Sequence, residues 1–456
     1  MSSSPPRSIK QTAIRGALWT VLSFGIQYAL RLGSNILLTR LLPPTAFGLM
    51  QLSSSVLIGF GMLSDTGVGP NIIQSNRGED PTFLNTARTI QIIRGILIFL
   101  GCAIVAVPAA RFYGQPEVLG LIMLGGLNMF IIGFENMSSY LLNRDLRIRE
   151  RETFALAEQV ISMVAMLIWA MISPTVWALA TGYVLSPLIR LVWTHYLVPG
   201  APKAKIEWDQ KSAQEILSFG KWIFFSTAAT FFAIQADRLI LGKMVGFELL
   251  GIYGIALTFA ELPRQVVGRI SAQILLPAIA RIADRPRAEL REKLLRNRYK
   301  VLLFAVLCLT PLICFGDFLI RFLYRGNYQT ADWMLPILAL GIWPNLLHES
   351  TRQALVAIGK PKYEAYGQFF KGLFVCSCIP LGIHYFGMLG AVIAVACNDL
   401  PLYSAVSHGL RQEGLNNVKQ DLLMTGLLLG LLAMILFARY IFGGGTPIDG
   451  LLVFPR

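Results

Sequence analysis

The sequence has few charged residues and no loop long enough to form a soluble domain. Charged side chains make up 14% of its 456 residues, whereas soluble globular proteins contain about 25%. Hydrophobic residues make up 54% of the chain and recur in long runs that short polar gaps separate. These shortages exclude a soluble globular protein and predict an all-α polytopic membrane protein.

The sequence also lacks the residue patterns of metal sites and phosphate loops. Its six cysteines fall in apolar segments without metal-ligand spacing, and its four histidines are scattered along the chain. It contains no glycine-rich loop of the GxxxxGKS or GxxxxGKT kind, which cradles nucleotide phosphates in other proteins. We therefore expect neither a cofactor nor a metal site.

Basic residues exceed acidic ones, with 40 Lys and Arg against 26 Asp and Glu and a net charge of +14. Nucleic-acid binding and membrane topology both explain such an excess. Every second loop is rich in Lys and Arg, as in the tail with Arg7 and Lys10 and in the loop 144–151, and the turns between are poor in both. This alternation favours topology, argues against a nucleic-acid partner and predicts a cytoplasmic N-terminus. The polar start and the lack of a small-residue cleavage site argue against a removed signal peptide.

Apolar runs of spanning length predict about a dozen membrane helices. They lie at about residues 17–40, 47–63, 90–107, 118–142, 155–172, 176–197, 222–241, 250–276, 301–319, 333–355, 366–385 and 389–407, with a further apolar run at 422–437. We expect residues 1–200 and 201–411 to form two six-helix bundles. Residues 412–456 add one or two C-terminal membrane helices, so the number of spans is thirteen or fourteen and the side of the C-terminus stays open.

The two predicted bundles share a weak internal repeat. At an offset of roughly 203 positions, these residues coincide: Trp19 with Trp222, Ser23 with Ser226, Gln27 with Thr230, Ser34-Asn35 with Asp237-Arg238, Arg40 with Lys243 and Gly48 with Gly251. At a slightly longer offset, Arg111-Phe112 coincides with Arg321-Phe322. Six spans separate the copies, so both begin on the same side of the membrane, and a parallel repeat places the expected binding site between the halves near the midplane. Chance similarity is the alternative.

Polar and charged residues interrupt several predicted spans, where each costs free energy unless it faces a partner or water. Three spans carry them at helical spacing: Ser23, Gln27, Arg31, Ser34 and Asn35 on the first, Ser226, Thr230, Asp237 and Arg238 on the seventh, and Glu261, Arg264, Gln265 and Arg269 on the eighth. Others stand singly: Arg94, Glu135, Glu158, Arg190, Asp317, Glu349, Lys371 and Asp399. Each is a candidate functional residue, to be weighed against a structural role.

Arg31 lies deep in its span beside a polar stripe, which favours a water-filled cavity over a structural role. Arginine stays protonated and matches phosphate geometry with two parallel hydrogen bonds, so such a cavity suits a diphosphate headgroup. The predicted substrate-binding residues are Arg31, Gln27, Asn35, Arg264 and Arg269.

Three further residues are the candidates for ion coupling or gating, namely Asp237, Arg238 and Glu261. Asp237 and Arg238 point to different helix faces, so structural pairing with neighbouring helices is an equal alternative. Glu261 precedes Arg264 by one turn and is expected to neutralise it. A position near a helix end, from which the side chain reaches the membrane interface, is the expectation for four others: Arg88, Arg190, Lys371 and Asp399.

Three segments resemble a known family. Residues 36–48 (ILLTRLLPPTAFG) look like the first loop of polysaccharide flippases, and residues 63–69 (LSDTGVG) with Ile72-Ile73-Gln74 resemble the end of their second helix. Residues 236–243 (ADRLILGK) with the glycines that follow resemble the junction of the seventh and eighth helices. The segments cover both halves of the chain and together identify a resemblance to the Wzx-like oligosaccharide flippases of the multidrug/oligosaccharidyl-lipid/polysaccharide exporter superfamily.

The resemblance implies a fold and an activity. The fold would be two MATE-like six-helix bundles around a central cavity with a cationic lumen. The activity would be transfer of a polyprenyl-diphosphate-linked oligosaccharide across the bacterial inner membrane, by ion-coupled alternating access without ATP hydrolysis. The partners would be this lipid-linked sugar, the bilayer and, within the pathway, a polysaccharide polymerase and glycosyltransferases.

Two other functions fit parts of the sequence. A drug or organic-cation exporter of the same superfamily needs an acidic and aromatic cavity, which the basic stripe opposes and Glu261, Asp237 and Glu349 keep open. A membrane-embedded polymerase or ligase acting on the same lipid-linked sugar needs a catalytic loop on the outer face. The outward turns here are short and contain no clustered acid–base pair, so the sequence favours a flippase.

Overall fold

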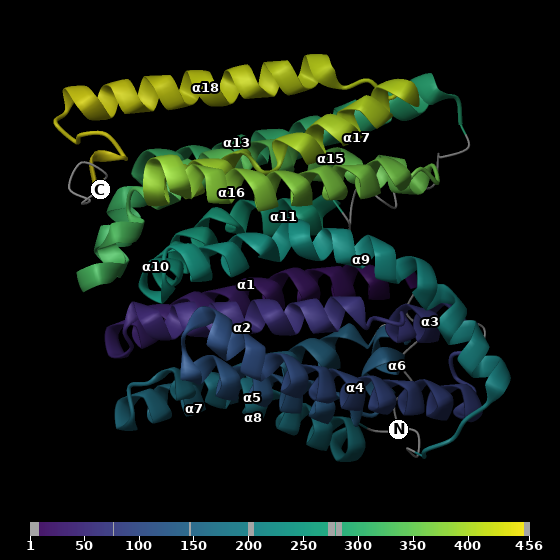
Figure 1. The fold of residues 1–456 in the computed structure, drawn as a ribbon. Coiled ribbons are helices and arrows are strands. Elements are labelled where there is room, and N and C mark those ends of the chain that lie inside the picture. The colour runs from purple at the N-terminus through teal and green to yellow at the C-terminus, as the bar shows by residue number, and fades with distance from the viewer. Residues whose placement is uncertain are drawn as a thin grey trace, which may run out of the picture. The chain divides into compact units, whose positions relative to one another are not determined.

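Helices are the only regular secondary structure in the part of the chain that the structure describes (Figure 1). The computed structural model describes residues 9–75, 77–145, 147–198, 205–271, 279 and 285–450. Long apolar runs form helices in a membrane because a helix satisfies its backbone hydrogen bonds within one segment. Contacts divide the chain into two compact units, Met1–Ala228 and Ala229–Arg456, which are called unit 1 and unit 2 below.

Unit 1 contains helices at each of the first six predicted spans. They are α1 (Ile9–Leu41), α2 (Pro44–Leu63), α3 (Val68–Gln74), α4 (Pro81–Tyr113), α5 (Pro116–Gly133), α6 (Ser138–Arg144), α7 (Ile148–Ile172), α8 (Val176–Val192), the π-helical turn η1 (Trp193–Leu197) and the first part of α9 (Gln210–Met244). Helices α4 and α5 can approach closely because Gly133 has no side chain. A Cβ at this position would lie only 2.8 Å from the carbonyl oxygen of Gln91.

Unit 2 contains the rest of α9 and helices at the later predicted spans. They are α10 (Phe247–Ala260), α11 (Leu262–Ile270), α13 (Arg287–Leu323), the 3-10 turn η3 (Gly326–Ala331), α14 (Met334–Gly341), α15 (Trp343–Ala357), α16 (Lys362–Cys397), α17 (Leu400–Gln412) and α18 (Val418–Ile441). Helix α16 is kinked at Gly387, whose φ of 58° and ψ of −142° favour glycine. The kink lies between the predicted eleventh and twelfth spans.

Eight helical segments among the described residues have the length and apolar composition of membrane spans, so the chain is a multi-pass membrane protein. The first and seventh predicted spans lie in α1 and α9, which are 33 and 35 residues long and carry the polar stripes. The fourth, eighth, tenth and twelfth are each divided between two helices, at Phe134–Met137, Glu261, Ile342 and Asn398-Asp399. The predicted bundle boundaries at residues 200 and 411 stay predictions.

The helix boundaries follow the offsets of the internal repeat. Helix α9 ends at Met244, 203 positions after α1 ends at Leu41, and α10 begins 203 positions after α2. Helix α13 ends 210 positions after α4, the offset that relates Arg111-Phe112 to Arg321-Phe322. Helix boundaries that recur at the same offsets as the residue matches, 203 positions at two boundaries and 210 at a third, favour a true repeat over chance similarity.

The start of α9 packs into the core of unit 1. Ala213 and Ile216 are buried in a cluster that includes Ile72, Phe83 and Met137. The segment before α9 runs along α4, where the amide of Asn85 donates to Glu207 Oε2 at 2.9 Å. The N–H and hydroxyl groups of Ser212 donate to the Asp209 carboxylate and hold its pKa below its ordinary value. The first turns of α9 are therefore part of the core of unit 1.

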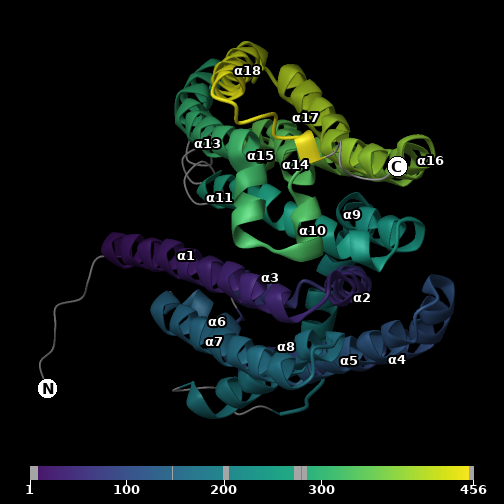
Figure 2. The same ribbon diagram turned by 90° about the vertical axis from the view of Figure 1, so that its left-hand side faces the viewer.

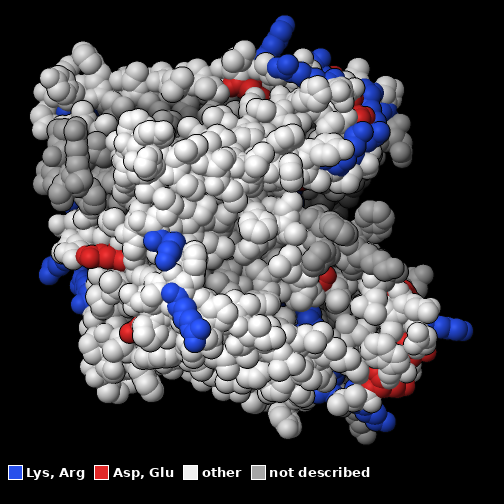
Figure 3. Space-filling model, in the orientation of Figure 1, with Lys and Arg blue, Asp and Glu red and all other residues white. Residues whose placement is uncertain are grey.

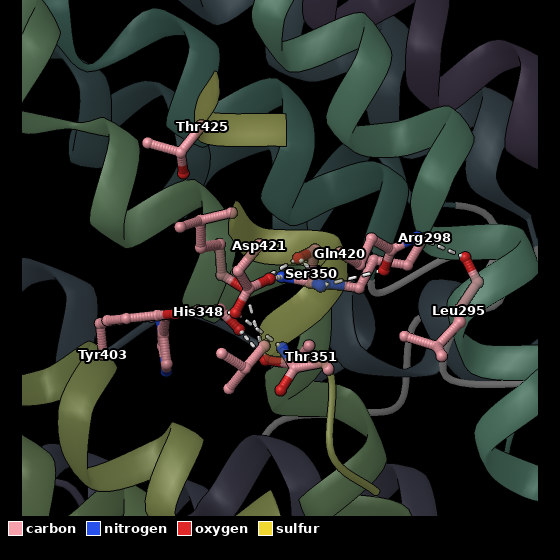
Figure 4. Close-up of polar contacts among 12 residues, drawn as sticks. Leu295, Arg298, His348, Ser350, Thr351, Tyr403, Gln420, Asp421 and Thr425 are labelled. Atoms are coloured by element: carbon pink, nitrogen blue, oxygen red, sulfur yellow. Dashed lines mark hydrogen bonds and ion pairs between the residues drawn. The ribbon is translucent and has the colours of Figure 1, made fainter. Parts of the chain in front are cut away.

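Helix α18 contains the predicted apolar run 422–437 and packs along α13 (Figures 1 and 2). Asp421 near its start forms an ion pair of 2.6 Å with Arg298 of α13, and Tyr403 donates to the same carboxylate (Figure 4). Arg439 near its end forms an ion pair of 2.5 Å with Asp317 of α13. Two buried ion pairs thus hold α18 against α13, and residues 451–456 lie outside the described part of the chain.

The surface agrees with a membrane protein that has basic loops. In unit 2, the Lys and Arg side chains gather over the end where α17 leads into α18, and the flanks of the helices are uncharged (Figure 3). Leu422, Leu423 and Phe437 of α18 expose more than 60% of their surface. An uncharged flank of this kind suits contact with lipid.

Candidate functional site

Unit 1 contains an open cavity between α1, α5, α7 and α8. Gln27, Arg31 and Ser34 line it from α1, Glu158 and Gln159 from α7, and Tyr183, Ser186 and Arg190 from α8. The Arg31 side chain is exposed and makes no hydrogen bond or ion pair with the described residues. The structure therefore places Arg31 in a cavity, as the sequence predicted, with its guanidinium available to a ligand.

Two further residues of the α1 stripe, Ser23 and Gln27, form hydrogen bonds with α7. Ser23 and Gln27 donate to Glu152 Oε2 at 2.5 and 3.3 Å, and Gln159 donates to the Gln27 carbonyl at 2.8 Å. Asn35 does not line the cavity, and its Oδ1 is buried without a hydrogen-bond donor among the described residues. The predicted substrate-binding residues of α1 thus separate into Gln27 and Arg31 in the cavity and Asn35 outside it.

Arg190 is the second cation of this cavity, and it is paired. Its Nη2 lies 2.7 Å from Glu158 Oε1, and its Nε lies 3.3 Å from Glu158 Oε2 and 3.8 Å from Glu135 Oε1. The Ser186 hydroxyl also donates to Glu158. We expected Arg190 to reach the membrane interface from a helix end; it lies in the last turn of α8 and is 41% exposed, and two buried carboxylates pair with it, so that expectation stays a prediction.

Unit 2 contains a smaller and more closed cavity that gathers six charged residues. They come from α9, the α10–α11 break, α11, α16 and the start of α17, and are Asp237, Arg238, Glu261, Arg264, Lys371 and Asp399. Three are acidic and three are basic, so this cavity is balanced in charge, whereas a cationic lumen was expected. Arg269 of α11 is not among the lining residues.

Two ion pairs organise the charges of this cavity. Arg264 Nη2 lies 2.7 Å from Glu261 Oε2, which confirms that Glu261 neutralises Arg264. Lys371 Nζ lies 2.6 Å from Asp399 Oδ1, and both side chains are about 95% buried. The expectation that Lys371 and Asp399 reach the interface from helix ends was wrong, because each has an oppositely charged partner in the interior.

Asp237 is the carboxylate of this cavity that forms no ion pair among the described residues. Its Oδ2 accepts from the Tyr253 hydroxyl at 2.6 Å, and its Oδ1 is buried without a hydrogen-bond donor in the described structure. The neighbouring Arg238 donates to Gln235 at 2.5 Å. Asp237 and Arg238 thus differ in their partners, as residues on different helix faces should.

Breaks in the helices place two of these acids. Glu261 separates α10 from α11, and Asp399 separates α16 from α17. Each is followed by Leu-Pro, and Pro263 and Pro401 occupy the first turn of the next helix, where the missing N–H costs no hydrogen bond. Broken helices of this kind line cavities in transporters. The Glu-Leu-Pro and Asp-Leu-Pro sequences were the local signal for both positions.

Sequence reasoning missed the pairing of the charged residues. Glu158 with Arg190 and Lys371 with Asp399 lie 32 and 28 positions apart, so no helical spacing connects them.

The side chain of Ser226 lies outside the described residues. No group of three metal-ligating side chains occurs in the described part of the chain.

Comparison with known sequences identifies relatives. Residues 37–331 match the sequence model of a family described as "Polysaccharide biosynthesis protein". The succinoglycan biosynthesis transport protein ExoT of Rhizobium meliloti is 23% identical over 278 residues, which cover 61% of this chain and 56% of that protein. The lipopolysaccharide biosynthesis protein WzxC of Escherichia coli is 22% identical over 295 residues, or 65% of this chain and 59% of that protein. The chain thus spans less than two thirds of the length of these relatives.

Comparison with solved structures identifies the fold. The lipid II flippase MurJ in an inward closed conformation matches with a TM-score of 0.72 and 16% identity over 95% of both chains. An inward-facing multidrug resistance MATE family transporter matches with a TM-score of 0.62 and 14% identity, over 88% of this chain and 96% of that one. Likeness at these identities shows the fold alone, and it confirms the predicted MATE-like architecture.

Proposed function

Because this chain belongs to the polysaccharide biosynthesis protein family, we propose that it flips a polyprenyl-diphosphate-linked oligosaccharide across the bacterial inner membrane, from the cytoplasmic to the periplasmic leaflet. The observation that carries the proposal is the cavity of unit 1, where Arg31 is exposed and uncommitted. The names of the relatives support it, since one is a transport protein for succinoglycan synthesis and one fold neighbour is a lipid II flippase.

The cavity of unit 1 suits a headgroup that is both anionic and polar. Arg31 presents a guanidinium fork for the diphosphate. Gln27, Gln159 and Tyr183 line the same cavity and offer amide and hydroxyl groups to sugar hydroxyls. In this proposal Asn35 and Arg269, which lie outside the two cavities, contact the cargo at another stage of transport.

The cavity of unit 2 suits coupling to an ion gradient. Glu261 forms an ion pair with the guanidinium of Arg264. A proton on Glu261 would break this ion pair and leave Arg264 to bind a diphosphate. Asp237 has a buried oxygen without a hydrogen-bond donor among the described residues, which makes it a second proton acceptor. We therefore assign gating and coupling to Asp237, Arg238 and Glu261 and cargo binding to Arg264. The N-terminus is cytoplasmic in this proposal, and the polymerase and glycosyltransferases of the pathway are the partner proteins.

A complementation experiment tests the proposal. Cells that lack the gene receive the wild type, Arg31→Ala, Arg264→Ala or the control Arg111→Ala, an exposed arginine at the end of α4. Surface polysaccharide and membrane insertion are then measured. We expect Arg111→Ala to restore surface polysaccharide. Arg31→Ala and Arg264→Ala should insert normally and transport about 10- to 100-fold less, since hydrogen bonds to a charged group are worth about 1.5–3 kcal/mol. Full restoration by both cavity variants contradicts the proposal.

An organic-cation exporter is the second candidate, and the charges of the two cavities decide against it. The lining of the unit 1 cavity includes two arginines and one glutamate, and the unit 2 cavity is balanced. A cation needs carboxylates or aromatic faces without competing guanidinium groups. Export of a cationic dye by the reconstituted protein, unaffected by Arg31→Ala, would favour this alternative.

A further inference from the structure

Glu135, Glu158 and Arg190 form a triad in unit 1 in which two buried acids share one partly exposed base. They come from three places in the chain, namely the break between α5 and α6, α7 and α8. The Glu135 and Glu158 side chains are 12% and 8% exposed. Arg190 and Glu158 line the cavity that contains Arg31.

The guanidinium of Arg190 is committed to Glu158. It makes two hydrogen bonds to that carboxylate, which also accepts from Ser186. Glu135 Oε1 lies 3.8 Å from Arg190 Nε, beyond hydrogen-bond distance, and is buried without a donor in the described structure. Glu158 therefore has an ion pair with two hydrogen bonds, whereas Glu135 has only the longer ion pair of 3.8 Å to the same guanidinium.

Other charged groups near the triad do not correct this imbalance. Arg94 and Asp65 are the other charged residues near Tyr140, which also lies near Glu135 and Arg190. Arg94 donates to Ser64, Gln91 and the Gly61 carbonyl, and Asp65 accepts from the Gly67 N–H. From α1, Arg31 lines the same cavity without an ion pair to either glutamate in the described structure. A buried carboxylate without a donor is costly to ionise, and two carboxylates that share one cation tend to retain a proton.

We propose that Glu135 and Glu158 hold one exchangeable proton beside Arg190, and that this proton sets the charge of the cavity that receives the cargo. With the proton bound, Arg31 and Arg190 face one carboxylate and the site is net positive. Without it, two carboxylates balance the two arginines. An anionic headgroup therefore binds better to the protonated site, and by linkage the headgroup strengthens the binding of the proton. This second step rests on the proposed function.

An infrared pH titration of the purified full-length protein tests the proton site without any cargo. We expect the wild type to show a protonated-carboxyl band, additional to any from Asp237 and Glu261 of unit 2, that is absent in both Glu135→Gln and Glu158→Gln, because the acid that remains then pairs one-to-one with Arg190. Arg190→Gln should strengthen the band, since two acids are left without a cation. The control Glu150→Gln, an exposed acid on α7, should leave it unchanged. A band that persists in both glutamate variants, or that no variant alters, overturns the proposal.

A binding titration with a short-chain isoprenyl diphosphate tests the link to the cargo. Affinity for the wild type should rise by up to about tenfold per unit of falling pH. Glu135→Gln should bind tightly throughout and show only the pH dependence of the probe itself. Equal pH profiles in the two proteins contradict the link. If the infrared result holds and the diphosphate does not bind at any pH, the proton site stands and the proposed cargo fails.

Discussion

Charged residues inside the units include those that form an ion pair with an oppositely charged side chain and those that face a cavity without one. Lys371 with Asp399 belongs to the first group, and Arg31 to the second. The sequence predicted that Arg31 faces a cavity, because a polar stripe on one helix shows where water must reach. It failed for the first group, because each pair joins different helices and the interior position of Lys371 depends on a partner 28 positions away.

Breaking the Lys371–Asp399 pair should destabilise unit 2 more than removing it. Lys371→Met leaves Asp399 buried with only Asn345 as a donor, and we expect a loss of about 3–5 kcal/mol in the free energy of unfolding. The double variant Lys371→Met/Asp399→Asn should recover most of that loss, since no unpaired charge remains. Thermal unfolding in detergent measures both. A double variant as unstable as the single one would show that the pair does not act as a unit.

Helix breaks are the feature of the elements that places the acids of unit 2. Pro263 and Pro401 follow Glu261 and Asp399 at the same distance, so the breaks were readable as local sequence. The sequence analysis predicted one unbroken span at about 250–276 because apolar composition continues across the break. Hydropathy reports what lies in the membrane, and it does not report whether the backbone continues as one helix.

Replacing Pro263 should join α10 and α11 into one helix and lower transport without lowering thermal stability. We expect Pro263→Ala to extend α10 into α11, displace the Glu261–Arg264 pair from the cavity of unit 2 and lower transport by about tenfold, with no loss of thermal stability, because alanine favours a continuous helix. The matched control is Pro108→Ala, inside α4 and outside both cavities, which should transport normally. Wild-type transport by Pro263→Ala would mean that the break has no part in function.

The attachment of α18 is a second property of an element that can be tested. Arg439 forms an ion pair with Asp317 and donates to the Cys314 carbonyl, while Arg298 holds the other end through Asp421 and Gln420 (Figure 4). Arg439→Met should leave Asp317 unpaired and destabilise the contact between α13 and α18 by about 3–5 kcal/mol. Proteolysis between α17 and α18, compared with the exposed-site control Lys419→Met, measures the release. Equal cleavage of both variants would contradict this role for the ion pair.

At the scale of the whole molecule, the internal repeat was the most informative signal in the sequence. Its offsets recur at the ends of α1 and α9, at the starts of α2 and α10 and at the ends of α4 and α13. The two copies nevertheless carry different chemistry. Ser34 lines a cavity with excess positive charge in unit 1, whereas the corresponding Asp237 lies in a balanced cavity in unit 2. A repeat fixes the architecture, and in the proposed function the individual side chains then divide cargo binding from coupling.

Helix α9 links the two units, since its first turns are buried in unit 1 and its later turns line the cavity of unit 2. In the proposed function, alternating access moves the units against one another, so we expect α9, which joins them, to take part in that motion. We expect Ile216→Asp, which removes the anchor from the core of unit 1, to impair transport more than Leu217→Asp, an exposed neighbour. Flipping rates of the two inserted variants compare them, and equal rates would argue against the anchor.

The central claim is that the chain moves a lipid-linked diphosphate sugar through a cavity in which Arg31 contacts the diphosphate. The most direct measurement is flipping in proteoliposomes that contain only this protein and a fluorescent polyprenyl-diphosphate oligosaccharide, followed by quenching from outside. We predict transfer between leaflets by the wild type and by Arg111→Ala, and transfer reduced about 10- to 100-fold in Arg31→Ala. Absence of transfer by the wild type under an imposed ion gradient, or equal transfer by Arg31→Ala, would contradict the account.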